Sequence, residues 1–303
     1  MENSNIDIVI TWVNGSDPKW LADKAKYVPD FKQPGSFEDK RFKDNSLLKY
    51  LFRGIEVNAP WVNHIYFVTY GHYPEWLNLD SKKLTLVKHT DFIPKEYLPT
   101  FNSCTIEMFL WNIPGLSEKF LYANDDTLFF NRVEPSYFFD NEGNVLTQTT
   151  AYYTCGSMHC NIVFNSYCLP YDEDLAQRKT IGWAPAMSHM IRPYLRSMME
   201  ECYHIYEARI LNSITRFRSE KNFNVYLYDH YNIINKKQRP RLYINYRYLQ
   251  SRSPNDMIKS TLTDNSVNMI CINDTSDLID IYNNYYIRDY FSRKYKTISD
   301  YEI

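Results

Sequence analysis

Two neighbouring aspartates, Asp125 and Asp126, follow the apolar run Phe120–Tyr122, and Asn124 stands directly before them. A second apolar run, Leu128–Phe130, comes at once after the pair. An unpaired carboxylate at the end of a buried strand is costly, so the pair needs a counter-charge. A divalent cation with oxygen ligands, shared with a substrate phosphate, is the natural one. Asp125 and Asp126 are therefore candidate metal ligands, and two solvated aspartates in a loop are the alternative.

Strands must carry these carboxylates to the edge of a sheet. Runs rich in β-branched and aromatic residues predict buried strands at Asp7–Val13, His64–Tyr70 and Leu84–His89. The helical spacing of Asn45–Asn58 falls between the first two of them. This order predicts an α/β domain with a largely parallel central sheet. Open sheets of this kind bind ligands beyond the carboxyl ends of their strands, which is where the acidic pair would lie.

Patterns in the rest of the chain predict further elements. A helix is expected from Ser103, as its cap, to Asn112. Of segment 132–165, only the strand at 145–150 has a clear pattern. The remaining expected elements are helices at Ile191–Arg209, Asn222–Ile234 and Leu278–Tyr295 and strands at Arg241–Leu249 and Ser266–Ile272. We find no long linker and no internal repeat, so we expect one domain over residues 1–303.

The turn Asn14–Pro18 follows the first strand and lies beside Trp12. It could cradle a nucleoside, with Asp17 capping the next helix, but a plain strand-to-helix turn is equally well supported. Arg53 and Lys49 share one face of their helix, and the spacing favours a solvated stripe over a phosphate-facing edge.

Further on, Asn102 and Ser103 begin a helix, where free backbone N–H groups could meet a phosphate. His189 precedes a helical pattern, and its spacing does not distinguish a catalytic base from a cap or a core residue. Arg216 and Arg218 flank a phenylalanine. Arginine suits bidentate phosphate contact, but such pairs also occur on solvated helix ends.

Composition excludes several classes of protein. The 303 residues are 44% hydrophobic and 23% charged, which is ordinary for a soluble globular protein. The net charge of −2 argues against nucleic-acid binding through bulk charge. We find no GxGxxG or P-loop motif, no apolar run of about 18 residues and no secretory signal, so we expect a cytoplasmic protein without a transmembrane segment. Cysteines 155, 160 and 168 around His159 allow a zinc site, but reduced thiols are favoured.

Four blocks of sequence together resemble a known family. They read IDIVITWVNGSDPKW; DNSLLKYLFRGIEVNAPWVNHIYFVTYG continuing to LPTFNSCTIEMFLWNIPGLSEKFLYANDDTLFF; SHMIRPYL continuing to RFRSEKNFNVYLYDHY; and CINDTSD. Their order and content resemble the Stealth family of hexose-1-phosphate transferases. That family includes bacterial capsular polysaccharide phosphotransferases and is similar to the catalytic subunit of N-acetylglucosamine-1-phosphotransferase. The blocks span nearly the whole chain.

The resemblance implies a GT-A-like, Rossmann-like fold of a nucleotide-sugar transferase. It implies transfer of a sugar 1-phosphate from a UDP-sugar, such as UDP-N-acetylglucosamine, to a hydroxyl of an acceptor glycan, with release of UMP. The setting would be capsular or other exopolysaccharide synthesis in a bacterium, with Mg²⁺ or Mn²⁺ as cofactor. The acceptor would be a polysaccharide or a lipid-linked oligosaccharide, reached in the cytoplasm or at the inner face of the membrane. Residues 1–150 would bind the nucleotide sugar, and residues 151–303 would serve the acceptor and complete the catalytic site.

The resemblance also assigns residues, block by block. The first block carries the nucleotide-facing turn, the second the donor-binding helices and the acidic end, and the third and fourth the remaining catalytic and metal-binding groups. In that order the residues are Trp12, Asn14, Gly15 and Asp17; Asp44, Asn45, Arg53, Asn102, Ser103, Glu107, Asn124, Asp125 and Asp126; His189, Arg216 and Arg218; and Asn273 and Asp274.

One departure affects the general base. Where the animal enzymes carry a histidine before the Ser-Glu pair of the third block, this chain has Arg218. His189 is therefore the preferred base, by elimination. Two other functions stay open: a metal-dependent glycosyltransferase that releases UDP, and a catalytically inactive glycan-binding module.

Overall fold

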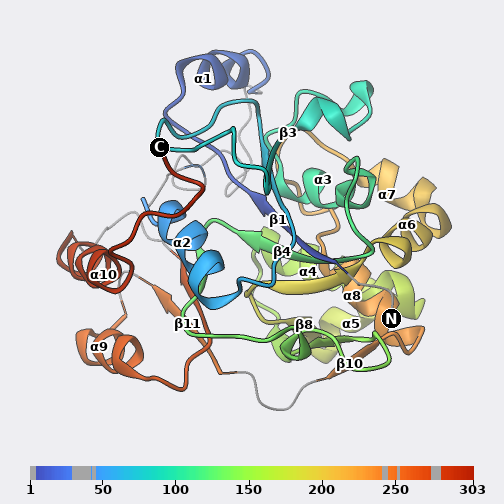
Figure 1. The fold of residues 1–303 in the computed structure, drawn as a ribbon. Helices are drawn as coiled ribbons and strands as arrows, with labels where there is room; N and C mark the ends of the chain where they lie inside the picture. Colours follow the sequence, from blue (N-terminus) through green and yellow to red (C-terminus); the bar gives the residue numbers. More distant parts are fainter. Residues whose placement is uncertain (1–4, 29–41, 43–45, 241–244, 251–252, 274–280) are drawn as a thin grey trace.

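The computed structural model describes residues 5–28, 42, 46–240, 245–250, 253–273 and 281–303 (Figure 1). Its centre is a five-stranded sheet in the order β3–β2–β1–β4–β9. The strands are β1 Ile6–Thr11, β2 Ile65–Thr69, β3 Leu84–Lys88, β4 Lys119–Asn124 and β9 Arg192–Leu195. The first four are parallel, and β9 runs antiparallel to β4. The predicted α/β class with a largely parallel central sheet is thereby confirmed.

The register of this sheet brings two predicted site segments to one edge. Thr11, the last residue of β1, is paired with Asn124, the last residue of β4. Because parallel strands end on the same side of a sheet, the turn after β1 and the acidic pair after β4 leave it together. Both strands are buried along most of their length, as their apolar runs predict.

A second sheet begins directly after the acidic pair. It joins β11 Tyr246–Gln250, β12 Met269–Asn273 and β5 Thr127–Phe129 in that order. Strand β12 is antiparallel to β5, with Cys271 opposite Thr127. Asp125 and Asp126 therefore form the link between two sheets. The pairing brings the end of β12, which carries the first three residues of the fourth sequence block, beside them.

Two pairs of strands complete the structure described. Strand β6, Val145–Thr147, is paired with β10, Gln238–Pro240. Strand β7, Thr149–Tyr153, is paired antiparallel with β8, Trp183–Met187. The Ser188 backbone N–H donates to the Gln148 carbonyl at 3.2 Å, so the second ladder continues up to the residue before His189.

Helices lie around the sheets (Figure 1). They are α1 Pro18–Ala25, α2 Leu48–Asn58, α3 Ser103–Glu107, α4 Met158–Tyr171, α5 Leu175–Ile181, α6 Arg196–Ile205, α7 Glu207–Ser213, α8 Tyr226–Ile234, α9 Asn255–Thr263 and α10 Ile281–Lys294. Helix α2 buries Leu51, Phe52 and Ile55, the apolar stripe that its spacing predicts. Among the described residues, none of these helices has the length and apolar character needed to cross a membrane.

Some predicted elements differ from those observed. The helix expected at Ile191–Arg209 begins only at Arg196, because Arg192–Leu195 forms the sheet strand β9. Pairing with β4 buries all four of those residues, which outweighs a local helical spacing. The helix expected to reach Asn112 ends at Glu107, and Asn102 rather than Ser103 caps it. The start of the strand expected from Arg241 lies outside the described residues.

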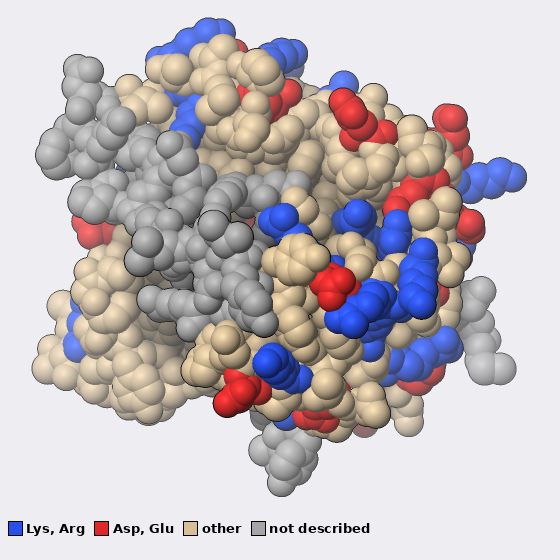
Figure 2. Space-filling view, turned by 90° about the vertical axis from the view of Figure 1, so that its left-hand side faces the viewer, with Lys and Arg blue, Asp and Glu red and all other residues tan. Residues whose placement is uncertain are grey.

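Surface charges are mixed in sign. In Figure 2, Lys and Arg side chains gather on one half of the face shown, with Asp and Glu side chains among them. This agrees with the small net charge of −2. Attraction of an anionic substrate would therefore depend on local groups rather than on the charge of the whole protein.

Arg53 belongs to the fold rather than to the sheet edge. Its Nε donates to one Glu302 oxygen at 2.7 Å and its Nη2 to the other at 2.5 Å, while Nη1 donates to the Tyr295 carbonyl at 2.7 Å. The Arg53 and Glu302 side chains are only 12% and 5% exposed. The guanidinium therefore fastens α2 to the segment that follows α10, and this geometry gives no support to the predicted contact with a phosphate.

We predict that Glu302→Gln lowers the free energy of unfolding at pH 7 by about 3 kcal/mol, because breaking one side of a buried ion pair leaves a buried charge. Urea unfolding measures this change. Burial acts to raise the Glu302 pKa, but Arg53 and Ser299 outweigh it and hold the pKa below the usual 4.5. The contribution is thus complete above that pH and is lost as the pH falls through the lowered pKa.

The control is Glu134→Gln, which removes the ion pair between Glu134 and Arg132. The Arg132 side chain is 59% exposed and the Glu134 side chain is 60% exposed. It should change stability very little. Equal stability of wild type and Glu302→Gln at pH 7 would contradict the role given to this pair.

Candidate active site

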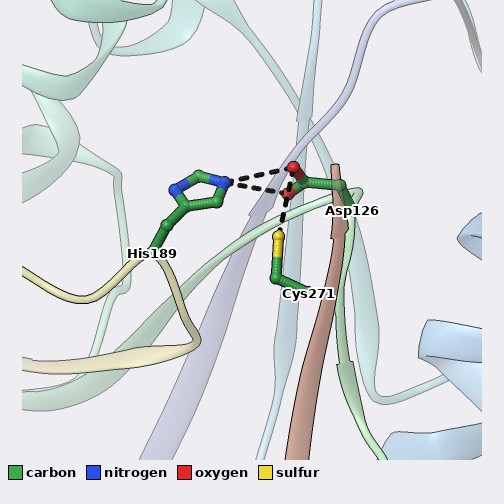
Figure 3. A group of neighbouring side chains, drawn as sticks. All are labelled: Asp126, His189 and Cys271. Atoms are coloured by element: carbon green, nitrogen blue, oxygen red, sulfur yellow. Dashed lines mark hydrogen bonds and ion pairs between the residues drawn. The ribbon is translucent and has the colours of Figure 1, made fainter. Parts of the chain in front are cut away.

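Asp126 lies at the centre of a cluster built from three distant segments (Figure 3). His189 Nε2 lies 3.2 and 3.1 Å from its two carboxylate oxygens. The Asn273 amide donates to Asp126 Oδ2 at 3.0 Å, and the Cys271 thiol lies 3.5 Å from the same oxygen. These partners come from the segment after β8 and from β12. The structure thus joins residues of the second, third and fourth sequence blocks at one carboxylate.

Opposing effects act on the Asp126 carboxyl. Burial alone would raise its pKa, but the neighbouring His189 and the hydrogen bonds from His189, Cys271 and Asn273 leave the pKa lowered. Burial and the Asp126 charge hold the pKa of the Cys271 thiol well above its ordinary value. A neutral thiol therefore donates to an ionised carboxylate, and Asp126 is stabilised as the anion that a cation or an imidazolium would need.

Strand β11 positions the backbone of His189. The hydroxyl of Tyr246, a residue of that strand, donates a short hydrogen bond to the His189 carbonyl. The residue before His189 is fixed as well, because the Ser188 N–H donates to the Gln148 carbonyl at the end of the β7–β8 ladder. The backbone of His189 is thus positioned by two independent elements, while its side chain stays about one-third exposed.

The cluster offers donor atoms for a divalent ion. One ligand atom each from Asp126, His189 and Cys271 lie within 4.8 Å of one another. Asn273 Oδ1 is buried and has no hydrogen-bond partner among the described residues, so an acceptor beside Asp126 is left unsatisfied. The oxygens of Asp126 and Asn273, with adjacent Asp125, suit a hard ion such as Mg²⁺ or Mn²⁺, whereas the sulfur and imidazole suit softer ions. The residues present therefore fit a divalent cation.

A buried chain of contacts fixes Asn124. Its side-chain oxygen lies 3.2 Å from the Thr11 hydroxyl and 2.9 Å from the Tyr122 hydroxyl. That Tyr122 oxygen lies 3.3 Å from Glu107, whose other oxygen accepts the Val225 N–H at 2.8 Å. Burial raises the pKa of Glu107 despite the Val225 N–H and the nearby Arg218 and Arg192 charges. Glu107 thus connects the end of β4 with the start of α8.

Asn102 positions the loop that carries the predicted arginines. Its side chain caps α3 by accepting the Cys104 N–H at 3.0 Å, and it donates to Thr215 and Asn222 at 3.0–3.2 Å. Arg218, held in this loop, donates a short bond to the Ser103 hydroxyl. The structure thus brings Ser103, Arg218 and Glu107 together at α3.

Arg216 is placed differently from Arg218. Its guanidinium lies over the Tyr27 ring, 4.7 Å from the centroid, and donates to the Leu98 carbonyl at 3.4 Å. These contacts tie the loop to neighbouring segments and not to the Asp126 cluster. The catalytic role of Arg216 stays a prediction.

The turn after β1 has structural duties of its own. Trp12 is buried with its ring 5.7 Å from that of Phe67, and Asp17 caps α1 by accepting the Trp20 N–H at 2.7 Å. The Asn14 backbone N–H donates to His72 at 2.8 Å. A Cβ on Gly15 would stand 2.1 Å from the Phe42 carbonyl oxygen, so only glycine fits there. These contacts explain the residue types, and nucleotide binding by them stays a prediction.

Three predicted site residues, Asp44, Asn45 and Asp274, lie outside the described residues. Two members of the site escaped the sequence reasoning, Cys271 and Tyr246. For Cys271 a signal was present, because residues i and i+2 of a strand face the same side and Asn273 was already a candidate. Tyr246 gave no such signal, since it acts on a backbone carbonyl 57 residues away.

Comparison with known proteins places the chain in a family. The family model described as Stealth protein CR1, conserved region 1, matches residues 4–32, and that of conserved region 2 matches residues 41–147. Capsular polysaccharide phosphotransferase WcwK of Streptococcus pneumoniae is 33% identical, covering 99% of each chain. Capsular polysaccharide phosphotransferase cps12A of Actinobacillus pleuropneumoniae is 31% identical over 99% of this chain and 83% of its own. The chain therefore belongs to the Stealth family.

The chain is also similar to another named phosphotransferase and, at much lower identity, to solved structures. Receptor polysaccharide phosphotransferase WefC of Streptococcus gordonii is 34% identical over 75% of this chain and 78% of its own. Among solved structures, an active-site mutant of LgtC aligns over 97% of this chain and 98% of its own at 10% identity with a TM-score of 0.44. The galactosyltransferase LgtC with donor and acceptor sugar analogs gives a TM-score of 0.41. The fold class is supported by the strand order and directions of the sheet itself.

We predict that Asn102→Ala lowers the free energy of unfolding by about 2 kcal/mol or more, since it removes a helix cap and leaves buried partners unsatisfied. Denaturant unfolding followed by far-UV circular dichroism measures the change. Asn235→Ala is the control, because this exposed side chain donates to the Tyr231 carbonyl at the end of its own helix, α8. If both variants unfold at the wild-type midpoint, Asn102 does not anchor the arginine-bearing loop.

Proposed function

We propose that this protein transfers a sugar 1-phosphate from a UDP-sugar, UDP-N-acetylglucosamine or a related UDP-hexose, to a hydroxyl of an acceptor glycan. UMP leaves and a phosphodiester forms, in the synthesis of capsular or other cell-surface polysaccharide. The observation that carries the proposal is the contact of His189 with Asp126, which unites an acidic sheet edge with a candidate base from 63 residues further along. The names of the relatives support the same class of reaction.

The donor diphosphate would lie at the acidic edge of the sheet. Asp125, Asp126 and the Asn273 oxygen would hold Mg²⁺ or Mn²⁺, with Asp274 as a further predicted ligand. When bound, such an ion neutralises charge on the diphosphate and on the leaving phosphate. Arg218 would add positive charge from α3, where Ser103 fixes its guanidinium. Arg216 stays a second candidate for that task.

His189 would act as the base. With its Nε2–H donated to Asp126, the neutral ring carries its lone pair on Nδ1, which would take the proton of the acceptor hydroxyl. The acceptor oxygen forms its bond to the β-phosphorus, and the bond from that phosphorus to the bridging oxygen breaks, so the bridging oxygen leaves with UMP. Asp126 holds the ring in place and stabilises the imidazolium that forms. Both halves of the chain, 1–150 and 151–303, would contribute to one catalytic domain.

The nucleotide product tests the reaction. With Mg²⁺ and a panel of UDP-sugars, we expect UMP rather than UDP, identified by anion-exchange chromatography. UDP would indicate a glycosyltransferase that attacks the sugar carbon. Absence of both nucleotides, together with glycan binding, would indicate a binding module without catalysis. Either result would overturn the proposed phosphotransfer.

Substitutions test the residues. Asp125→Ala and Asp126→Ala should each lower kcat by about 10²–10³-fold or more, because each removes an electrostatic partner of the transition state. His189→Ala should lower kcat by about 10²–10⁴-fold. The matched control is His204→Ala, an exposed histidine of α6, which should keep wild-type turnover. Near wild-type turnover of the aspartate variants at saturating donor and metal would refute the metal-binding role.

The metal preference follows from the donor atoms. Chelation with EDTA should abolish turnover, and Mg²⁺ or Mn²⁺ should restore it. Zn²⁺ should inhibit, because it favours the His189 nitrogen and Cys271 sulfur and so removes the proposed base. Inhibition should weaken in Cys271→Ser, and Cys202→Ser, a buried cysteine of α6, is the control. Full activity with Zn²⁺, unchanged by Cys271→Ser, would contradict this assignment.

The partners follow from the same reaction. The acceptor would be a growing polysaccharide or a lipid-linked oligosaccharide, because these present free sugar hydroxyls. We propose that the enzyme works in the cytoplasm or peripherally at the inner face of the membrane, where a nucleotide-sugar donor and such an acceptor meet.

A further inference from the structure

The two-stranded β7–β8 sheet carries two large exposed rings. Tyr153 is 68% exposed and Trp183 is 42% exposed. The antiparallel register makes them direct partners across the two strands. Directly opposed residues have their Cβ atoms about 5 Å apart, so the two side chains leave the same face of the sheet from neighbouring positions. Two large aromatic side chains left open to solvent on one face need a physical reason.

The register shows how the rest of this face is composed. Side chains alternate along a strand, so Thr149, Ala151 and Tyr153 share a face with their partners Met187, Pro185 and Trp183. We call these six residues the outer strip. On the opposite face, Ala184 and Ala186 are buried, and the Tyr152 ring lies 5.5 Å from that of His159 in α4. One face of the sheet is therefore packed on α4, and the strip is the other face, which is exposed except near Met187 at its buried end.

The strip leads toward the candidate active site. Strand β8 runs from Trp183 to Met187 and ends two residues before His189. At about 3.3 Å per residue, the strand from Trp183 to Met187 spans roughly 13 Å, and His189 follows two residues later. Met187, at the near end, is buried and contacted by Gln238, whereas Trp183, at the far end, is open. A ligand along the strip would thus reach the catalytic centre as an extended chain, not as a single sugar.

We propose that the outer strip of the β7–β8 sheet binds the acceptor glycan, with sugar rings stacked on Trp183 and Tyr153 and the reacting hydroxyl delivered toward His189. This inference rests on the proposed function and adds the place and mode of acceptor binding. Aromatic faces suit the C–H faces of sugar rings, and the Thr149 hydroxyl can bond a sugar hydroxyl. None of the six strip residues is charged, so an anionic polymer or a lipid headgroup finds no cation there.

A second copy of the chain fits the strip less well. Stable interfaces bury about 800 Å² on each partner and use some 20–30 residues. Six residues, of which Met187 is buried and Ala151 is small, fall far short of that. A narrow strip with two exposed aromatic side chains suits an extended oligosaccharide better.

Binding of defined oligosaccharides tests the proposal. The probes are hexasaccharides of β-1,4-glucose, α-1,4-glucose, β-1,4-N-acetylglucosamine and N-acetyllactosamine. The affinity of each is measured by calorimetry and compared with that of its mono- or disaccharide unit. At least one hexasaccharide should bind wild type tenfold or more tightly than its unit. Trp183→Ala and Tyr153→Ala should each lose about tenfold of that affinity, and Trp183→Phe should retain most of it. Tyr285→Ala, at an α10 tyrosine that is 72% exposed, is the control and should bind as wild type does.

Several results would overturn the proposal. One is that wild type binds no hexasaccharide more tightly than its unit. A second is that Trp183→Ala binds glycan with wild-type affinity. A third is that wild type forms a concentration-dependent dimer in sedimentation and Trp183→Ala abolishes it. UMP release from the donor without acceptor separates this inference from the proposed function. That release should be equal in wild type and Trp183→Ala. If UMP is released but glycan affinity does not change in Trp183→Ala and Tyr153→Ala, this inference alone fails. If glycan affinity depends on the strip but no nucleotide is released, the proposed function fails and the glycan-binding role of the strip is supported.

Discussion

The charge of Asp126 is the constraint on which the site depends. This carboxylate stands between the last residue of one strand, in the central sheet, and the first strand of another sheet, where burial opposes its ionisation. Three partners outweigh that effect and hold the Asp126 pKa below its ordinary value, one of them His189 and two of them from β12. The second sheet, with β12 paired to β5, is therefore as necessary to the site as the central sheet that carries Asn124–Asp126.

The elements that could be predicted from the sequence are those whose own residues determine their structure. The apolar runs of β1, β2 and β4 are buried, and the apolar stripe of α2 faces the core as its spacing predicts. The predictions were wrong where contacts with a distant segment determine the structure. Arg192–Leu195 has no strand pattern by itself, and only pairing with β4 makes it β9. The position of Arg53 likewise depends on Glu302, which no local pattern connects to α2.

Several residues that the resemblance assigns to donor binding also hold the fold together. Asn102 caps a helix and fixes a loop, Gly15 admits the close approach of Phe42, and Glu107 joins β4 to α8. Family resemblance marks all such residues alike, because loss of the frame and loss of the chemistry both abolish function. The three-dimensional contacts show the structural role of each residue, and donor binding by Gly15, Asn102 and Glu107 stays a prediction.

The distance in sequence between Asp126 and its partner Asn273, 147 residues, has a consequence for biosynthesis. Contacts so far apart form only after the intervening chain exists and has closed the loop between them. While a ribosome is still extending the polypeptide, the two aspartates are present without the strand that completes their surroundings. A nascent chain would thus lack the contacts that keep the Asp126 pKa low until β12 has been synthesised and docked.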